Sequence, residues 1–174
     1  IIESLLLCPE IGKVIIDTDS PIIREDALRS FPTVTVLERP EHLRRGDIAM
    51  NKVLLNTISK VKADFYLQTH STNPLLRPET ISRAVRSFTD NYPDHDSLFG
   101  ATRWQTRLWD GAAQAINHDP ARLLRTQDLP PIYEENSNLY IFTGDGLEKR
   151  GNRIGDRPLI FEIDRLEAWD IDEE

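Results

Sequence analysis

The stretch Asp64–Pro78, with the sequence DFYLQTHSTNPLLRP, decides the fold of this chain. Phe65–Leu67 is an apolar run that is too short for a helix and ends in a turn-rich segment, so it predicts a buried strand. Polar side chains follow at positions 68–73, and Pro78 stands where a new helix would begin, a position that suits proline. The strand thus delivers a polar loop to its own carboxyl end, which is where ligands bind in open α/β sheets. The same pattern also fits an ordinary strand–helix loop.

Strands and helices alternate on both sides of this stretch. β-Branched and apolar runs predict strands at 13–16, 33–37, 65–67, 97–102, 138–142 and 159–163. Apolar spacing and proline positions predict helices from Pro21, from Asp47 to about Lys60, from Pro78 to before Pro93, and over 144–150. Asp19 or Ser20 is expected to cap the first of these helices and Asp47 the second. The order predicts an α/β fold, a mostly parallel sheet with helices on both faces, in one domain over residues 1–174.

The composition is ordinary for a soluble globular protein. Hydrophobic residues make up 39% and charged residues 29% of the 174 residues, which is enough for a sizeable core. No apolar run approaches the roughly 20 residues that span a membrane, so no membrane partner is expected. A net charge of −8 argues against general nucleic-acid binding, although not against a small anionic substrate. Cys8 is the only cysteine, which excludes an internal disulfide and favours a reducing compartment, the cytoplasm.

The start of the chain and one internal segment differ from the rest in residue composition and pattern. Ile1–Leu7 has no initiator methionine and reads as the last turns of a helix already under way, so we expect the sequence to be N-terminally truncated. The segment 103–131 is polar, contains two tryptophans and lacks sustained periodicity. A stretch of this length without regular elements is usually functional or disordered, and the tryptophans favour an ordered excursion.

Two carboxylates close the chain in the sequence Asp170-Ile171-Asp172. In extended backbone the side chains at positions i and i+2 point the same way. Two carboxylates on one side form a good seat for Mg²⁺, which prefers oxygen ligands and often bridges to phosphates. A solvated acidic tail would have the same sequence.

Arginines and a glutamine precede the segment Asp128–Pro131. Arg122, Arg125 and Gln127 stand within a few residues of one another. Arginine suits a carboxylate or phosphate because it offers two parallel hydrogen bonds. Surface ion pairing explains the same residues equally well. His70 could line the site after the central strand, and no Gly-rich phosphate loop is present in the sequence.

Taken together, these segments resemble the acylneuraminate cytidylyltransferase family, the CMP-sialic acid synthetases. The resemblance spans nearly the whole chain and lies in the order of five motifs: VIIDTDS at 14–20, Arg39-Pro40 through Leu43 and Asp47, LQTHSTNPLLR at 67–77, RTQDLPPIYEENSNLY at 125–140, and Asp170-Ile171-Asp172. The chain departs from the family at His70, Asn73 and Ser137. The family has glycine at the last of these three positions.

The resemblance implies a fold of the nucleotide-diphospho-sugar transferase (Rossmann-like) type and a nucleotidyl transfer from CTP to a sialic-acid-like α-keto sugar acid, with release of pyrophosphate. The same resemblance implies a role for each site residue. Asp170 and Asp172 would hold Mg²⁺ and act in catalysis, and Arg39 would lie near the nucleotide. The sugar acid would be contacted by Gln68, Arg125, Gln127 and Tyr140, with Arg125 on its carboxylate. The excursion would help to form a homodimer. The family's Gly-rich phosphate loop should precede Ile1, so residues 1–174 alone are expected to fold poorly and to be inactive.

Two other classes remain open on sequence grounds. A metal-dependent glycosyltransferase also uses a D-x-D pair to bind a nucleotide-sugar diphosphate, although there the pair usually follows a mid-chain strand. A non-catalytic domain that kept the fold would also lack the phosphate loop.

Overall fold

The computed structural model describes residues 1–171, and strands alternate with helices along them as expected. The elements are α1 (Ile2–Leu6), β1 (Ile15–Thr18), α2 (Pro21–Ser30), β2 (Thr35–Glu38), η1 (Glu41–Leu43), α3 (Met50–Lys60), β3 (Tyr66–Thr69), α4 (Pro78–Asn91), β4 (Ser97–Trp104), η2 (Thr126–Asp128), β5 (Ile132–Phe142), α5 (Gly144–Arg150) and β6 (Pro158–Glu162). Each strand and helix expected from the sequence is present. Within residues 1–171, no helix is both long and apolar enough to cross a bilayer.

The main sheet has four strands in the order β3-β5-β4-β6. β4 runs parallel to β6, whereas β5 is antiparallel to both β3 and β4. Three of the four strands therefore point the same way, with β5 as the exception. β1 and β2 form a separate parallel pair. The α/β class with a mostly parallel arrangement is confirmed.

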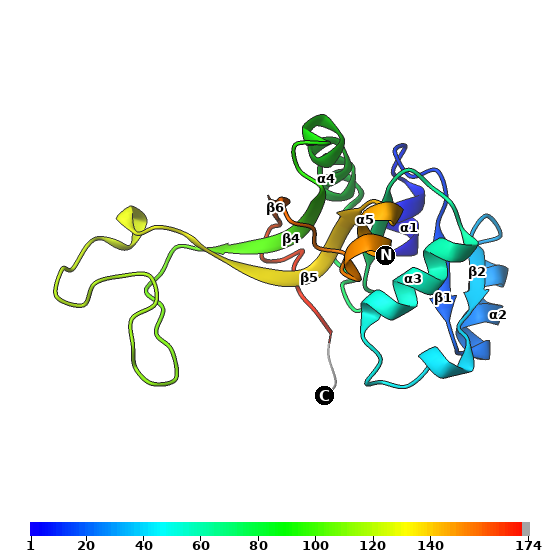
Figure 1. Ribbon diagram of the computed structural model, residues 1–174, viewed down its shortest axis with the longest axis horizontal. Coiled ribbons are helices and arrows are strands. Elements are labelled where there is room, and N and C mark those ends of the chain that lie inside the picture. The colour runs from blue at the N-terminus through cyan, green and yellow to red at the C-terminus, as the bar shows by residue number, and fades with distance from the viewer. Residues whose placement is uncertain (172–174) are drawn as a thin grey trace.

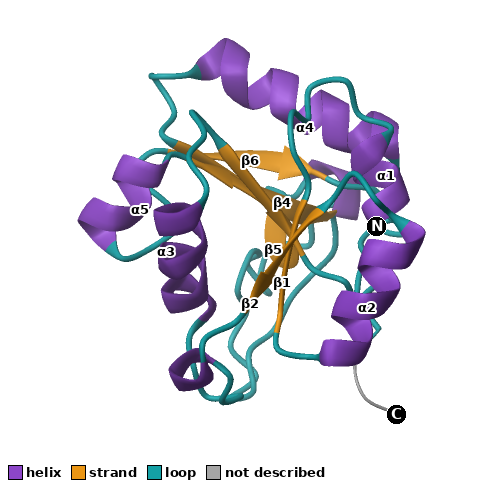
Figure 2. Cartoon of the chain, turned by 90° about the vertical axis from the view of Figure 1, so that its right-hand side faces the viewer, coloured by secondary structure: helices purple, strands orange, loops and turns teal. Residues whose placement is uncertain are grey.

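Helices cover both faces of the strands, with α3 and α5 on one side and α1 and α4 on the other (Figure 2). Side chains alternate between the two faces along each strand. In β5, Tyr140 and Phe142 pack with α3 and α5, while Leu139 and Ile141 belong to the core beneath α4. All four are buried. This alternation explains why the end of β5 is apolar at every position, as expected for a strand that is covered on both faces.

A cavity separates the two sheets. It has a volume of about 710 Å³ and is lined on one side by residues 13–15 and on the other by residues 65–69. Within the described residues, β1 pairs only with β2, and β3 pairs only with β5. The facing edges of β1 and β3 therefore have unpaired backbone groups on either side of the cavity. Gln68 and Thr69, at the carboxyl end of β3, also line it.

The segment between β4 and β5 projects away from the body of the molecule (Figure 1). β4 and β5 continue into it as a two-stranded ribbon in which Arg103 pairs with Tyr133 and Trp104 with Ile132. The expected excursion therefore begins after Trp104, and β5 starts six residues before the expected strand at 138. The reason is that a ribbon exposed on both faces tolerates the polar residues at 134–137, which hid the strand in the sequence.

The N-cap residue predicted from the sequence is correct for one helix and wrong for another. The Ser20 hydroxyl accepts a hydrogen bond from the backbone N–H of Ile23 at 3.3 Å, as expected for the cap of α2. The expectation that Asp47 caps α3 is wrong. The helix begins at Met50 after an Ala49 N-cap, and the Asp47 carboxylate accepts two hydrogen bonds from Arg45, both at 3.0 Å. Because the Asp47 carboxylate already accepts both hydrogen bonds of a bidentate arginine two residues away, it does not cap the helix.

Ser137 lies in left-handed backbone, with φ of 56°. A side chain with a Cβ in this region costs about 1–2 kcal/mol, whereas glycine loses about 0.5–1 kcal/mol more chain entropy on folding. We expect Ser137→Gly to leave the free energy of unfolding unchanged or to raise it by up to about 1 kcal/mol in urea denaturation. Ser137→Val is the matched control and should lower it, because β-branched residues fit positive φ worst. A glycine variant less stable than the valine variant would contradict the strain at this position.

Candidate active site

The C-terminal segment lies against the loop that follows β3. The backbone N–H of Ile171 donates to the carbonyl of Thr72 at 2.8 Å, and the Asn73 side-chain amide donates to the carbonyl of Trp169 at 3.2 Å. Asn73 is fully buried, so this contact is shielded from water. The two contacts bring Asp170, on an exposed stretch, to the carboxyl end of β3.

Glu167 fixes the same C-terminal segment to the start of α4. Its side chain is buried, and its carboxylate accepts hydrogen bonds from the backbone N–H of Arg77 at 2.9 Å and from the Thr80 hydroxyl at 3.0 Å. A carboxylate at a helix N-terminus is stabilised by the helix dipole. The buried Asn138 amide also donates to the Glu167 carbonyl at 2.7 Å. The position of Asp170 is therefore set by buried polar contacts of Glu167 before it and by the backbone contact of Ile171 after it.

Asp170 fits a magnesium site of the kind that is completed by phosphates. Mg²⁺ in such sites takes one or two carboxylates, and substrate phosphates and water supply the other ligands. Asp170 is exposed beside the β3 loop, and its negative charge reaches His70. Among residues 1–171, no three or more His, Cys, Asp or Glu side chains converge as a ready-made metal cage. Asp172, the second predicted ligand, lies outside the described residues.

Gln68 and Tyr140 face each other across the pairing of β3 with β5. The Tyr140 hydroxyl donates to the Glu135 carboxylate. Burial, followed by this hydrogen bond, raises the pKa of Tyr140 above its ordinary value. The side-chain carbonyl of Gln68 accepts a hydrogen bond from Arg153 Nη1 at 2.6 Å. These two of the four residues expected to contact a sugar acid are thus neighbours on the α3–α5 face, where Tyr140 is fully buried.

Arg153 is the member of this group that sequence reasoning missed. Its guanidinium carbon lies 3.6 Å from the centre of the Tyr140 ring. The loop that carries it precedes β6, so its place in the chain indicated the opposite edge of the sheet. The available signal was an arginine within GNRIGDRP, a turn-rich stretch that starts with Gly151 in left-handed backbone, φ 66°.

His70 lies half-buried in the loop after β3. Its Nε2 atom is buried and has no hydrogen-bond partner among residues 1–171. Burial, followed by the positive charge of Arg153, lowers the pKa of the ring, and the negative charge of Asp170 acts in the other direction. The imidazole is therefore neutral at neutral pH and offers one nitrogen as an acceptor.

The remaining predicted site residues lie elsewhere. Arg125 and Gln127 are exposed in the projecting segment, where the Arg125 guanidinium donates to the Asp128 carboxylate at 2.7 and 3.1 Å. Arg39 lies at the end of the β1–β2 pair and donates to the Asp17 carboxylate at 2.8 Å and to the Asp17 carbonyl at 3.0 Å. Within one chain, neither arginine is hydrogen-bonded to Gln68, Tyr140 or Asp170.

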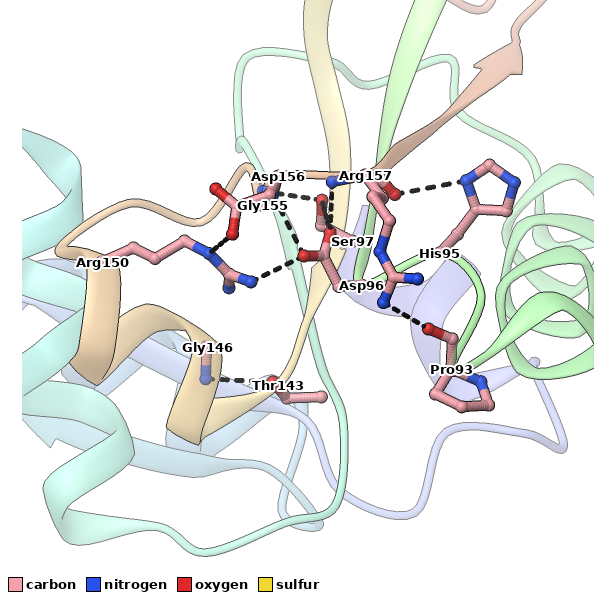
Figure 3. Close-up of polar contacts among 10 residues, drawn as sticks. All are labelled: Pro93, His95, Asp96, Ser97, Thr143, Gly146, Arg150, Gly155, Asp156 and Arg157. Atoms are coloured by element: carbon pink, nitrogen blue, oxygen red, sulfur yellow. Dashed lines mark hydrogen bonds and ion pairs between the residues drawn. The ribbon is translucent and has the colours of Figure 1, made fainter.

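A carboxylate clamp holds the loop that carries Arg153 (Figure 3). Asp96 accepts hydrogen bonds from Arg150 Nη2 at 2.6 Å and from the backbone N–H groups of Asp156 and Arg157, both at 3.0 Å. The backbone N–H of Gly155 donates to the Ser97 hydroxyl at 2.8 Å. A methyl group at Gly155 would overlap the Asp96 carboxyl group, so this approach requires glycine.

The other end of the same loop is attached to the start of α3. The Asn51 side-chain carbonyl accepts from the backbone N–H of Arg153 at 3.2 Å, and its amide donates to the Asn152 side chain at 3.3 Å. Both ends of the loop are therefore tied to elements of the main body.

Comparison with known proteins identifies the class of molecule that this fold and site define. A profile of the cytidylyltransferase family matches residues 1–171, and the chain belongs to this family. It is 25% identical to the post-translational flagellin modification protein B of Campylobacter coli over 174 residues, which covers 92% of this chain and 72% of that protein.

Solved structures share the fold at low sequence identity. CMP:2-keto-3-deoxy-manno-octonic acid synthetase complexed with CTP has a TM-score of 0.63 at 16% identity and covers 92% of this chain and 76% of its own. The 4-diphosphocytidyl-2C-methyl-D-erythritol synthase of Anaerococcus prevotii has a TM-score of 0.68 at 10% identity and covers 98% of this chain and 77% of its own. The nucleotide-diphospho-sugar transferase type of fold expected from the sequence is confirmed.

Proposed function

We propose that this cytidylyltransferase activates a sialic-acid-like α-keto sugar acid, transferring CMP from CTP to the acid and releasing pyrophosphate. The observation that carries the proposal is the contact between residues 169–171 and the loop after β3. This contact brings Asp170 to the loop after β3, and Gln68 in β3 pairs across the sheet with Tyr140 of β5. A metal-binding carboxylate and sugar-binding polar groups at one strand end suit a transfer between a nucleotide and a sugar.

The name of one of the similar proteins fits an acid substrate. One solved structure is a synthetase for a 2-keto sugar acid in complex with CTP. The flagellin modification protein is similar over nearly the whole chain. Sialic, legionaminic and pseudaminic acids, or a related keto acid, are the candidate substrates.

The proposed roles are those that the family resemblance implies. The anomeric hydroxyl of the acid attacks the α-phosphorus of CTP, a bond to that oxygen forms, and the bond to the pyrophosphate oxygen breaks. Such transfers depend chiefly on positioning and on neutralising phosphate charge. Mg²⁺, held by Asp170 together with Asp172, would supply that neutralisation when bound. Gln68 and Tyr140 position the sugar, and Arg39 lies toward the nucleotide.

The projecting segment leads us to propose a homodimer. Arg125 is assigned to the acid's carboxylate, yet its segment extends away from the body that carries Gln68 and Tyr140 (Figure 1). A second copy of the chain is the simplest molecule for this segment to reach. In such a dimer, Arg125 and Gln127 of one protomer would complete the site of the other.

We expect the complete gene product to release pyrophosphate from CTP with an α-keto sugar acid. Arg125→Ala should raise the KM for the acid roughly tenfold or more, since a charge-assisted hydrogen bond is worth about 1.5–3 kcal/mol. The measurement is pyrophosphate release with each nucleoside triphosphate and a panel of acids. Equal activity with neutral sugar phosphates would contradict the proposed substrate.

Mixing two inactive variants tests the dimer in the same assay. Asp170→Asn and Arg125→Ala protomers, each impaired alone, should recover activity when they are mixed, because a mixed dimer contains one site with both residues intact. If the mixture stays as inactive as its parts, Arg125 does not act across a dimer.

A further inference from the structure

Arg153 lies at the centre of the Gln68–Tyr140 pair and has spare hydrogen-bonding capacity. Guanidinium groups have five N–H donors. Within residues 1–171 the Arg153 side chain forms one hydrogen bond, from Nη1 to the Gln68 carbonyl at 2.6 Å. The others have no acceptor in that part of the chain, and the side chain is half-buried.

No carboxylate within residues 1–171 neutralises Arg153. Among the other half-buried arginines, Arg39 pairs with Asp17 at 2.8 Å and Arg150 with Asp96 at 2.6 Å, whereas Arg107 donates to the Leu124 carbonyl. A partly buried charge without a counter-ion costs free energy, which its stacking on the Tyr140 ring offsets only in part. A ligand with negatively charged oxygens would remove that cost.

The surroundings of Arg153 do not compete for its charge. Glu135, the acid next to Tyr140, already accepts the tyrosine hydroxyl. His70 is neutral because its burial and the charge of Arg153 both disfavour the imidazolium.

The loop holds Arg153 in this place before any ligand arrives. Asp96 accepts from the backbone N–H groups of Asp156 and Arg157 (Figure 3). On the other side, the Asn51 side chain accepts from the backbone N–H of Arg153 itself at 3.2 Å. A side chain on an anchored loop loses less entropy on binding than one on a mobile loop. Such preorganisation is typical of a residue that recognises a ligand, whereas an arginine that is merely solvated at the surface does not require it.

We propose that Arg153 is a specificity-determining residue that binds an oxyanion of the substrates, a carboxylate or a phosphate, beside Gln68 and over the edge of Tyr140. The proposal rests on the proposed function for the identity of the substrates. It adds a cationic subsite that belongs to the body of the same chain, in contrast to Arg125 on the projecting segment. The subsite selects for a negatively charged substituent at the position where Gln68 and Tyr140 meet the substrate.

The test uses the complete gene product and three variants. Arg153→Gln removes the charge and keeps amide donors, Arg153→Lys keeps the charge and loses the planar fork, and Lys149→Gln, exposed in the last turn of α5, is the matched charge control. We expect Arg153→Gln to raise one KM about tenfold or more with kcat changed less than about threefold, Arg153→Lys to fall between, and Lys149→Gln to match the wild type.

The two substrates separate the two sources of the oxyanion. A raised KM for the acid alone assigns the carboxylate, and a raised KM for CTP alone assigns a phosphate; either result supports the subsite. Unchanged KM values for both substrates, with only a lower melting temperature, would overturn it and leave Arg153 as packing for Tyr140.

Anion binding without turnover keeps this test apart from that of the proposed function. Inorganic phosphate and pyruvate, as probes of the two chemistries, should raise the melting temperature of the wild type and of Lys149→Gln more than that of Arg153→Gln. If no acid is turned over with CTP but this difference is found, the proposed substrate fails and the oxyanion subsite stands. Equal stabilisation of all variants would overturn the subsite whatever the activity.

Discussion

Asp170→Asn is expected to reduce kcat by on the order of a hundredfold or more in the complete gene product, because even the outer partners of a metal site change activity by about 10–100-fold. The amide keeps the size of the carboxylate and removes its charge, and Mg²⁺ prefers charged oxygen ligands. The melting temperature should barely move, since Asp170 is exposed and its backbone neighbours Trp169 and Ile171 make the structural contacts.

Pyrophosphate release at several magnesium concentrations measures the effect. Asp170→Asn should also raise the magnesium concentration that gives half-maximal activity. Asp164→Asn is the matched control, because this exposed residue lies in the same segment and accepts a hydrogen bond from the Leu166 N–H at 2.9 Å that an asparagine carbonyl can replace. Near-normal turnover in Asp170→Asn would mean that the acidic segment is a solvated tail.

Asp96→Ala is expected to lower the free energy of unfolding by about 3 kcal/mol, because it leaves a partly buried arginine and two backbone N–H groups without their acceptor. The side chains of Asp96 and Arg150 are only 15% and 24% exposed. Asp156→Ala is the control. It removes the other partner of Arg150, whose side chain is 79% exposed, and should cost less than about 1 kcal/mol.

The contribution of the Asp96 carboxylate to the free energy of unfolding depends on pH. Burial of the carboxyl acts to raise its pKa, but the backbone N–H groups of Arg157 and Asp156 and the charge of Arg150 outweigh it and hold the pKa below the ordinary value. A depressed acid stabilises the fold above its unfolded pKa of about 3.9, and this stability is lost as the pH falls through the folded value.

Urea denaturation between about pH 3 and pH 7 measures both effects. The gap between wild type and Asp96→Ala should be constant near neutrality and shrink below about pH 4. Equal stability losses in Asp96→Ala and Asp156→Ala would show that water replaces the Asp96 contacts.

The elements of the fold could be predicted because their signals are local. Pro21 and Pro78 occupy the first turns of α2 and α4, and the apolar runs of the strands are short and bounded by turn residues. The separation of the strands into two sheets, and the outward extension of β5 from Ile132, depend on contacts between distant segments. The Asp47 cap failed for a related reason, since a choice between two donors for one carboxylate is decided by geometry.

The candidate site was predictable only in part. The strand end at Gln68 follows from apolar patterning, and the pairing of Gln68 with Tyr140 follows from the resemblance of their motifs. Arg153 could not be found in this way. Its side chain reaches the site because the loop after α5 is tied to both Asp96 and Asn51, and neither contact has a local signature in the sequence.

The cavity between β1 and β3 separates the β1–β2 pair from the four-stranded sheet. No backbone hydrogen bond of a sheet crosses it within residues 1–171, so β1, α2 and β2 adjoin the four-stranded body through side chains, such as the Thr57 hydroxyl that donates to Asp17 at 2.8 Å. Such a unit can open locally without disturbing the pairing of the larger sheet. We therefore expect the Arg39–Asp17 pair, on the proposed nucleotide side, to open more often than the part of the proposed site that carries Gln68, Tyr140 and Arg153.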